Sequence, residues 1–180
     1  YEIISDFNFN DLESVYECLR LNSGKEFFNS KFYMIKDRDH LIITKHIENN
    51  SVFIHQVTKE IETPCLSFSV SSNLDNQYSH PSKSAIKTAI CFNKLEFPLM
   101  LRPWHEGDSF IPLGMKSFKK VSDYFIDKKL SLIDKRKAKI LTSNNKIVCI
   151  ITEKHHRLDD RFKLVQDSKK IYIVTSKSIL

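Results

Sequence analysis

The sequence predicts an α+β fold of two small domains, built mainly from antiparallel β-sheet with a few short helices. Three observations support this expectation. Short runs of β-branched and aromatic residues alternate with polar turn residues, apolar residues at helical spacing occupy only short stretches, and the net charge changes sign near the middle. A chain of 180 residues can form one medium domain or two small ones, each with a modest core.

The first half of the chain has the pattern of one helix followed by strands. Residues 11–21 carry apolar side chains three and four positions apart and precede Gly24, so we expect a helix that ends before this glycine. Residues 31–35 and 41–44 flank a polar tip and predict a β-hairpin. Further strands are expected at residues 51–57, 65–70 and 85–92.

The second half predicts a short helix among several strands. Val121, Tyr124 and Phe125 form an apolar stripe typical of a helix over residues 121–127, and we expect Tyr124 and Phe125 in the core. Strands are expected at residues 99–101, 137–141, 146–152, 163–165 and 171–175.

Charge is unevenly distributed along the chain. Residues 1–93 hold 9 Lys and Arg against 12 Asp and Glu, a net charge of −3. Residues 94–180 hold 19 against 10, a net charge of +9, and the two parts together give the chain's +6. We therefore expect a helix-plus-sheet domain over residues 1–94 and a basic domain over residues 95–180. Such asymmetry favours a polyanionic partner for the basic domain, although a merely solvated basic face is the alternative.

Several classes of catalytic site are disfavoured. The three glycines, Gly24, Gly107 and Gly114, are isolated, whereas a loop that holds nucleotide phosphates needs clustered glycines. No serine lies in a Gly-x-Ser-x-Gly context, and the neighbouring acids Asp159 and Asp160 have the pattern of solvent-facing residues. We expect no catalytic residue and no bound cofactor in this chain.

Cysteine and histidine spacing gives no metal motif. The four cysteines are widely spread, so we expect reduced, mostly buried thiols in a cytoplasmic protein. His155 and His156 are adjacent and would point to opposite faces of a strand, which makes a poor joint metal site. No apolar run approaches the roughly 20 residues that span a bilayer, and no secretory signal is visible. Because the chain opens on Tyr1 rather than Met, we expect an excised fragment or a trimmed tag.

Basic residues concentrate between residues 116 and 139, where nine Lys and Arg stand against three Asp. Lys119 and Lys120 directly precede the predicted helix, whose free backbone N–H groups would add to their charge. Gly114 could adopt a positive φ and let a backbone approach closely. The stretch predicts a phosphate-binding surface. The alternative is a solvated lysine-rich helix that forms salt bridges with its own aspartates.

Residues 99–129 resemble the signature of the C-terminal domain of the lysidine synthetases. In that family an Arg-rich strand leads into Gly-Asp, then a Phe-x-Pro-x-Gly turn, then Lys-Lys-x-Ser-Asp-Phe-Phe. Residues 157–162, Arg-Leu-Asp-Asp-Arg-Phe, match a later Arg-Ile-Asp-Asp-Arg-Phe segment, and residues 23–27 and 36–39 resemble the preceding domain. Cys91 stands where Asp is frequent, and His155 stands where Gly is frequent. The resemblance covers nearly the whole chain.

The resemblance implies the C-terminal region of a lysidine synthetase, an ATP-dependent carbon–nitrogen ligase of the cytoplasm, without its N-terminal ATP-pyrophosphatase domain. The family's Ser-Gly-Gly-x-Asp-Ser loop, which binds ATP, is absent from this sequence. The intact enzyme would adenylate the wobble cytidine in the CAU anticodon of an isoleucine tRNA, and lysine would then displace AMP. ATP with Mg²⁺ and lysine would be substrates of the missing domain.

Such an enzyme must distinguish its tRNA from the methionine tRNA with the same anticodon, and the resemblance assigns this task to appended domains that hold the acceptor stem. Residues 1–94 would then be a middle, substrate-binding-like domain and residues 95–180 the tRNA-binding domain. The expected partners are isoleucine tRNA and the enzyme's own catalytic domain, a homodimer is left open, and no membrane is expected. The alternative function is a protein-interaction or dimerisation module with a basic face and no RNA role.

We expect tRNA contacts from basic side chains of the second half, since duplex RNA is read mainly by shape and charge. The expected contacts are Lys116, Lys119, Lys120, Lys128 and Lys129, with Arg102 and Arg136 as second choices. Arg102 could instead pair with Asp108 or Asp123, and Arg157 and Arg161 could pair with Asp159 and Asp160 inside the fold. Trp104 could stack on a base or lie in the core.

Overall fold

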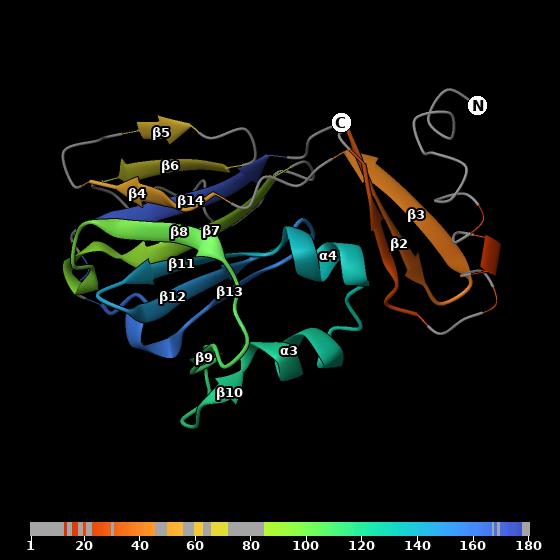
Figure 1. The fold of residues 1–180 in the computed structure, drawn as a ribbon. Coiled ribbons are helices and arrows are strands. Elements are labelled where there is room, and N and C mark those ends of the chain that lie inside the picture. Colours follow the sequence, from red (N-terminus) through yellow and green to blue (C-terminus); the bar gives the residue numbers. More distant parts are fainter. Residues whose placement is uncertain are drawn as a thin grey trace.

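A computed structural model gives the fold of the chain (Figure 1). It describes residues 23–29, 31–45, 50–55, 60–62, 66–71, 85–166 and 170–177, with the single residues Glu13, Tyr16, Glu17, Arg20 and Ser168. Most of the helix predicted at residues 11–21 lies outside the described residues. The described elements are mainly antiparallel strands with short helices, which confirms the predicted α+β class.

Two antiparallel sheets stacked face to face form the body of the molecule (Figure 1). The five-stranded sheet has the order β13-β12-β11-β8-β4, and the four-stranded sheet has the order β5-β6-β14-β7. The first consists of β4 (Val52–Ile54), β8 (Leu99–Pro103), β11 (Lys139–Ser143), β12 (Lys146–Ile151) and β13 (His156–Leu158). The second consists of β5 (Glu60–Glu62), β6 (Leu66–Ser71), β7 (Ala85–Cys91) and β14 (Ile171–Lys177).

The central strands β11 and β12 are buried on both faces. Because side chains alternate along a strand, Leu141 and Cys149 face the four-stranded sheet while Ile140 and Ile150 face the opposite side. The core between the sheets also contains Ile54, Ile90, Leu99, Leu101, Val148, Ile151, Leu158, Phe162, Tyr172 and Val174. The five-stranded sheet is therefore the middle layer of the body.

The second face of this sheet is covered by β9 (Ser109–Phe110), β10 (Lys119–Lys120) and α3 (Val121–Asp127), which is followed along the chain by α4 (Leu132–Lys137), a helix without buried residues. Val121, Tyr124 and Phe125 are buried there, so the predicted helix and its core residues are confirmed. Trp104 packs edge-on against Phe125, with ring centroids 5.3 Å apart. Trp104 is partly buried and packs against this core, which favours the core alternative over a base contact.

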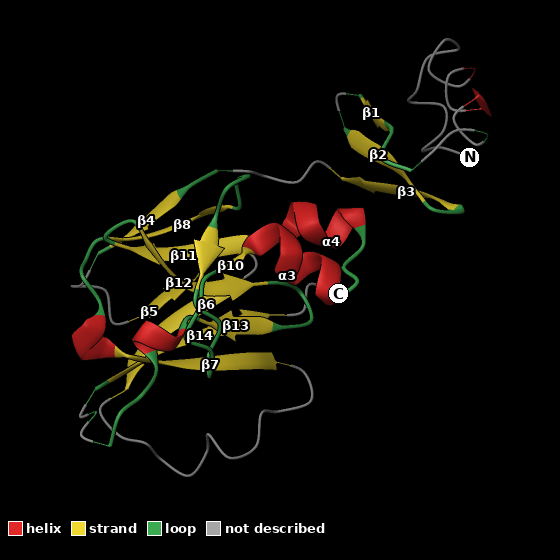
Figure 2. Cartoon of the chain, turned by 90° about the horizontal axis from the view of Figure 1, so that it is seen from below, coloured by secondary structure: helices red, strands yellow, loops and turns green. Residues whose placement is uncertain are grey.

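A separate three-stranded sheet lies beside α4 (Figures 1 and 2). It consists of β1 (Glu26–Phe28), β2 (Phe32–Asp37) and β3 (His40–Lys45), in the order β1-β2-β3. The hairpin predicted from the two flanking apolar runs is confirmed as β2 and β3. Arg38, in the turn between β2 and β3, has a φ of 54°, the left-handed conformation found in tight turns between antiparallel strands.

Strands from both sides of the expected boundary at residues 94 and 95 share sheets. β4 pairs with β8, and β7 pairs with β14 along seven residues. The boundary therefore does not coincide with a break between sheets. Among the described residues, the change from one sheet system to the next falls between β3 and β4. The net charge of a segment depends only on its own residues, whereas the sheets are formed by strands from distant segments. A change of net charge therefore need not coincide with a break between sheets.

Two local predictions were wrong. Residues 163–165 form no strand, because Asp159 caps a 3-10 helix at Asp160–Phe162 and turns the chain there. The helix α4 was not predicted, and its last residue is Lys137, where a strand was expected to begin. The hydroxyl of Ser131 accepts the Asp134 N–H at 3.1 Å and caps α4, a spacing that the sequence could have disclosed.

The imidazole of His156 on β13 predicts a pH-dependent stability. Burial lowers the pKa of His156 to about 4, from an ordinary value of 6.5. Its Nδ1 lies 3.0 Å from the Thr88 hydroxyl on β7, and its buried Nε2 has no hydrogen-bond partner. As the pH falls from 6.5 towards 4, the unfolded chain takes up a proton that the folded chain does not, so the free energy of unfolding falls by about 2–3 kcal/mol. Denaturant unfolding at both pH values measures this loss.

The matched variant is His156→Gln, which keeps polar atoms but cannot take up a proton. Its unfolding free energy should change less over the same pH range than that of the unmodified chain. Identical pH dependence in the two proteins would contradict a role for His156.

Candidate nucleic-acid interface

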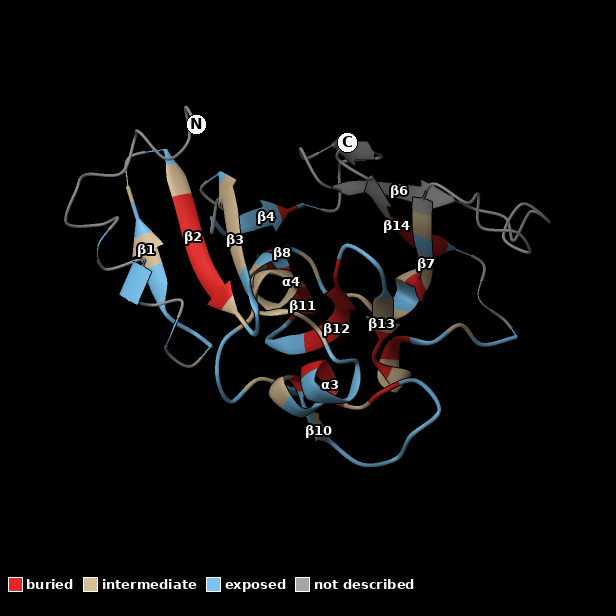
Figure 3. Ribbon diagram, turned by 90° about the vertical axis from the view of Figure 1, so that its right-hand side faces the viewer, coloured by how far each residue is buried: buried red, intermediate tan, exposed pale blue. Residues whose placement is uncertain are grey.

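The basic motif folds into one unit formed by β9, the loop at residues 111–118, β10 and α3 (Figures 1 and 3). In the β9–β10 pair, Lys119 is opposite the buried Phe110 and Lys120 is opposite the exposed Ser109. Residues directly opposite in an antiparallel pair share a face. Lys119 is accordingly partly buried and forms an ion pair with Asp127, whereas Lys120 is exposed.

Four of the predicted lysines have ammonium groups free for a ligand. Lys116 lies on the loop, Lys120 on β10, and Lys128 and Lys129 follow the C-terminal end of α3. All four are exposed, and none forms an ion pair with another described residue. Since α3 is about 10 Å long at 1.5 Å per residue, Lys120 before it and Lys128 and Lys129 after it lie at the two ends of a short helix.

The N-terminus of α3 contributes less than the sequence predicted. Lys120 is the N-cap residue and its side chain makes no capping bond. The N–H group of Val121 is already occupied, because it donates to the Asp108 carbonyl at 2.9 Å. The side chains of the lysines, rather than the start of the helix, make this surface basic.

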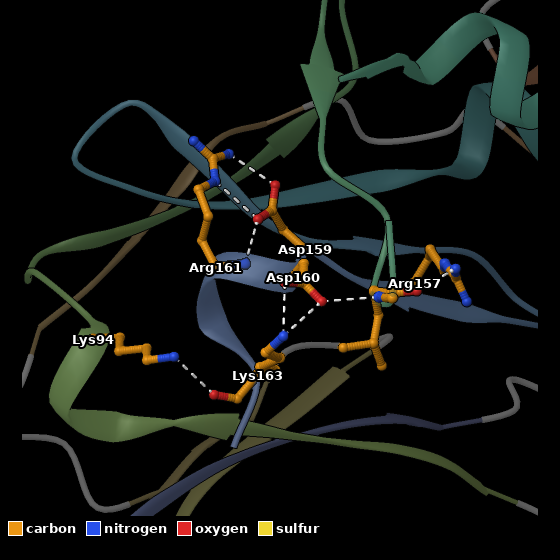
Figure 4. A network of polar contacts seen from close by, with 8 residues as sticks. Lys94, Arg157, Asp159, Asp160, Arg161 and Lys163 are labelled. Atoms are coloured by element: carbon orange, nitrogen blue, oxygen red, sulfur yellow. Dashed lines mark hydrogen bonds and ion pairs between the residues drawn. The ribbon is translucent and has the colours of Figure 1, made fainter. Parts of the chain in front are cut away.

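The loop at residues 111–118 is held in place by the segment from Arg157 to Arg161 (Figure 4). The carboxylate of Asp159 is fully buried, which corrects the expectation that it faces solvent. It accepts the Ile111 N–H at 2.9 Å and the Arg161 N–H at 2.9 Å. The guanidinium of Arg161 binds both carboxylate oxygens, at 2.9 and 2.8 Å. The expected pairing of Arg161 with Asp159 is thus present.

Asp160 holds the middle of the same loop (Figure 4). Its carboxylate accepts the Gly114 N–H at 2.9 Å and binds the Lys163 ammonium at 2.9 Å. These bonds, with that from Gly114 the stronger influence, lower the pKa of Asp160. The expected pairing of Arg157 with one of these acids is not present. Its guanidinium instead donates to the Leu113 carbonyl at 2.9 Å.

Arg102 is engaged in an internal ion pair. Its guanidinium binds the two carboxylate oxygens of Asp108 at 2.7 and 2.8 Å, and both side chains are largely buried. Burial alone would raise the pKa of Asp108, but hydrogen bonds from Arg102 and from the His105 N–H hold it below its ordinary value. The structure realises the ion-pair alternative, and a tRNA contact by Arg102 stays a prediction.

Arg136 joins α4 to the three-stranded sheet. Its guanidinium donates to the Glu26 carboxylate at 2.7 Å and to the Tyr33 hydroxyl at 3.0 Å. The guanidinium carbon also lies 4.3 Å from the centre of the Tyr33 ring, within the range of a cation–π contact. Asp37 adds a second link by accepting the Leu132 N–H at 3.1 Å. The predicted tRNA contact by Arg136 would compete with these bonds and stays a prediction.

Metal ligands and membrane spans were sought in the part of the chain that the structure describes. No three His, Cys, Asp or Glu side chains lie together there as a metal site would require. Cys91 and Cys149 are buried free thiols, whereas Cys18 and Cys65 fall outside the described residues. Over the same residues, no helix has the length and apolar character that crossing a bilayer requires.

Replacing Asp159 by Asn is predicted to destabilise the fold. The amide would leave the guanidinium of Arg161 without its buried anion and would lose the charged bonds that hold the loop. We expect the free energy of unfolding to fall by about 2–3 kcal/mol. The control is Asp160→Asn, which alters the more exposed carboxylate of the same segment and should cost much less. Chemical denaturation of both variants measures the difference, and equal losses would contradict the central role of Asp159.

Comparison with known proteins gives related sequences and a related fold. The family model described as the TilS substrate binding domain matches residues 1–47. The tRNA(Ile)-lysidine synthase of Parabacteroides distasonis is 35% identical over 177 residues, which cover 97% of this chain and 40% of that protein. The corresponding synthase of Bacteroides thetaiotaomicron is 30% identical over 170 residues, 93% of this chain and 36% of that protein.

A solved structure described as the TilS C-terminal domain matches with a TM-score of 0.54 and 12% identity, covering 73% of this chain and all of that one. At this identity the match concerns the fold alone. The chain spans about two-fifths of the length of the related synthases. In sequence over nearly its whole length and in fold over most of it, the chain is therefore a relative of the tRNA(Ile)-lysidine synthases and corresponds to their C-terminal region.

Proposed function

We propose that this chain is the tRNA-binding part of a tRNA(Ile)-lysidine synthase. The whole enzyme would ligate lysine to the wobble cytidine in the CAU anticodon of isoleucine tRNA, using ATP, in the cytoplasm. A catalytic N-terminal domain would bind ATP with Mg²⁺ and lysine. The present chain would hold and discriminate the tRNA through its acceptor stem, and it would carry no catalytic residue of its own.

The observation that carries the proposal is the set of four exposed lysines on one anchored unit. Lys116, Lys120, Lys128 and Lys129 have no ion-pair partner among the described residues. Duplex RNA offers a dense phosphate backbone and a shallow minor groove, so affinity comes largely from such ammonium groups. Lys119 is a weaker candidate, because it would have to leave Asp127 to bind a phosphate.

The acceptor stem is proposed as the binding site because the activity requires discrimination between two tRNAs. The isoleucine tRNA and the methionine tRNA carry the same anticodon, so the anticodon cannot distinguish them. A region outside the catalytic domain is suited to reading a distant part of the tRNA. A rigid basic unit on a β-sandwich fits a duplex, which is recognised by shape and backbone charge.

Titration of this chain with isoleucine tRNA and with its isolated acceptor-stem minihelix tests the proposal. The titration is run at about 50 and about 200 mM salt, a range over which several phosphate contacts change affinity by orders of magnitude. We expect comparable, salt-sensitive binding to both RNAs. Absence of binding to either RNA, together with concentration-dependent self-association, would favour the alternative of a protein-interaction or dimerisation module.

The double substitution Lys120→Ala/Lys128→Ala is predicted to weaken tRNA binding and to lower its salt dependence. Each phosphate contact contributes about one unit to the slope of log affinity against log salt, so the slope should fall by about two. The stability of the fold should change by less than about 0.5 kcal/mol, since both side chains are exposed.

The matched control is Lys146→Ala, an exposed lysine at the turn between β11 and β12. It should leave both affinity and slope unchanged. Unaltered binding by the double variant would remove Lys120 and Lys128 from the proposed contacts.

A further inference from the structure

We infer that Phe118 and Arg161 form a stacking site for an unpaired RNA nucleotide, next to the lysines proposed to hold the stem. The inference rests on the proposed function and extends it, because it adds a single-stranded subsite to a surface that otherwise fits duplex RNA.

Phe118 is the most exposed aromatic residue of the basic unit. Its side chain is 63% exposed at the end of the loop that precedes β10. A single exposed apolar residue is common on protein surfaces. What distinguishes Phe118 is its partner, because the guanidinium carbon of Arg161 lies 5.4 Å from the centre of the phenyl ring, a cation–π distance.

Arg161 and the first half of the loop before Phe118 are fixed by hydrogen bonds to Asp159 and Asp160. The guanidinium of Arg161 is fixed by its two bonds to the buried carboxylate of Asp159, at 2.9 and 2.8 Å. The loop that carries Phe118 is fastened at Ile111 and at Gly114 by the neighbouring acids. A preorganised aromatic and cationic pair loses little conformational entropy when a ligand binds.

The chemistry around the ring favours a nucleotide. Flat bases stack on aromatic side chains and on guanidinium planes, whereas phosphates bind ammonium groups. Lys116 lies two residues before Phe118 and Lys120 two residues after it, and both are exposed. An apolar protein partner would have to approach through these charges, whereas a polyanion would be attracted by them.

The base must be unpaired to reach the ring. Inside a duplex, both faces of each internal base are covered by its neighbours, so the ring can receive only a base that leaves the stack, such as a nucleotide beyond the end of the stem. The subsite therefore predicts a preference for RNA in which a single-stranded extension follows the duplex.

Two hairpin RNAs with the same stem test this inference, one with a blunt end and one with an unpaired 3′ extension. The unmodified chain should bind the extended hairpin more tightly. Phe118→Leu, which keeps an apolar side chain, should reduce affinity for the extended hairpin by about 5- to 50-fold and leave the blunt hairpin unaffected. Phe118→Tyr should keep the preference. The matched control is Ile126→Ala on α3, where the side chain is 64% exposed and no loss is expected.

The outcomes separate the inference from the proposed function. Salt-sensitive binding of both hairpins with equal affinity would overturn the subsite and leave the stem-binding surface intact. Equal losses on both hairpins in Phe118→Leu would also overturn it, because the ring would then contact the paired stem. Unchanged affinities in that variant would likewise overturn it, because the ring would then contribute nothing to RNA binding. Failure of the unmodified chain to bind either hairpin would remove the proposed function together with the inference.

Discussion

The buried carboxylate of Asp159 is the interaction on which the basic unit depends. A charged group that is excluded from water must be paired and hydrogen-bonded, since burying an unpaired ion destabilises the folded state by several kcal/mol. Asp159 meets this requirement only when Ile111 and Arg161 are both in position. The same carboxylate therefore fixes the loop that follows β9 and orients the guanidinium under Phe118. Segments separated by 48 positions in the sequence are joined at this point, so the surface that carries the lysines is defined by a residue that no ligand can touch.

Arginine and lysine have different roles in this structure. The planar guanidinium can bind both oxygens of a carboxylate, and Arg102 and Arg161 do so inside the fold, while Arg136 binds a carboxylate and an aromatic ring at the contact with the three-stranded sheet. The exposed lysines have no such geometric demand and remain available to a polyanion. A count of basic residues in the sequence overestimates the positive charge that the surface offers to a polyanion, because part of that charge is already paired with carboxylates inside the fold.

Local patterns in the sequence predicted local structure well. The β2–β3 hairpin, the helix that begins after Lys120 and the burial of Tyr124 and Phe125 each follow from the side-chain spacing of a few neighbouring residues. The pairing of β7 with β14 and the burial of Asp159 depend on contacts between distant segments, which periodicity cannot disclose. The same limit applies to the candidate site. The sequence predicted the lysines as contacts, but it could not distinguish Lys119, which forms an ion pair with Asp127, from Lys120, which has no such pair among the described residues.

The two kinds of charge should also respond differently to salt. Ion pairs that are largely excluded from water are screened little. The Arg102–Asp108 pair has side chains only 14% and 12% exposed, and in the Arg161–Asp159 pair the carboxylate is 0% and the arginine 33% exposed. Exposed ammonium groups are screened within about 8 Å at physiological ionic strength. Rising salt should therefore weaken the proposed contacts between the lysines and RNA before it loosens the loop and helix that present them. The proposed surface could then release RNA while its own geometry is kept, because the carboxylates of Asp108 and Asp159 are far less exposed than the lysines that carry the free charge.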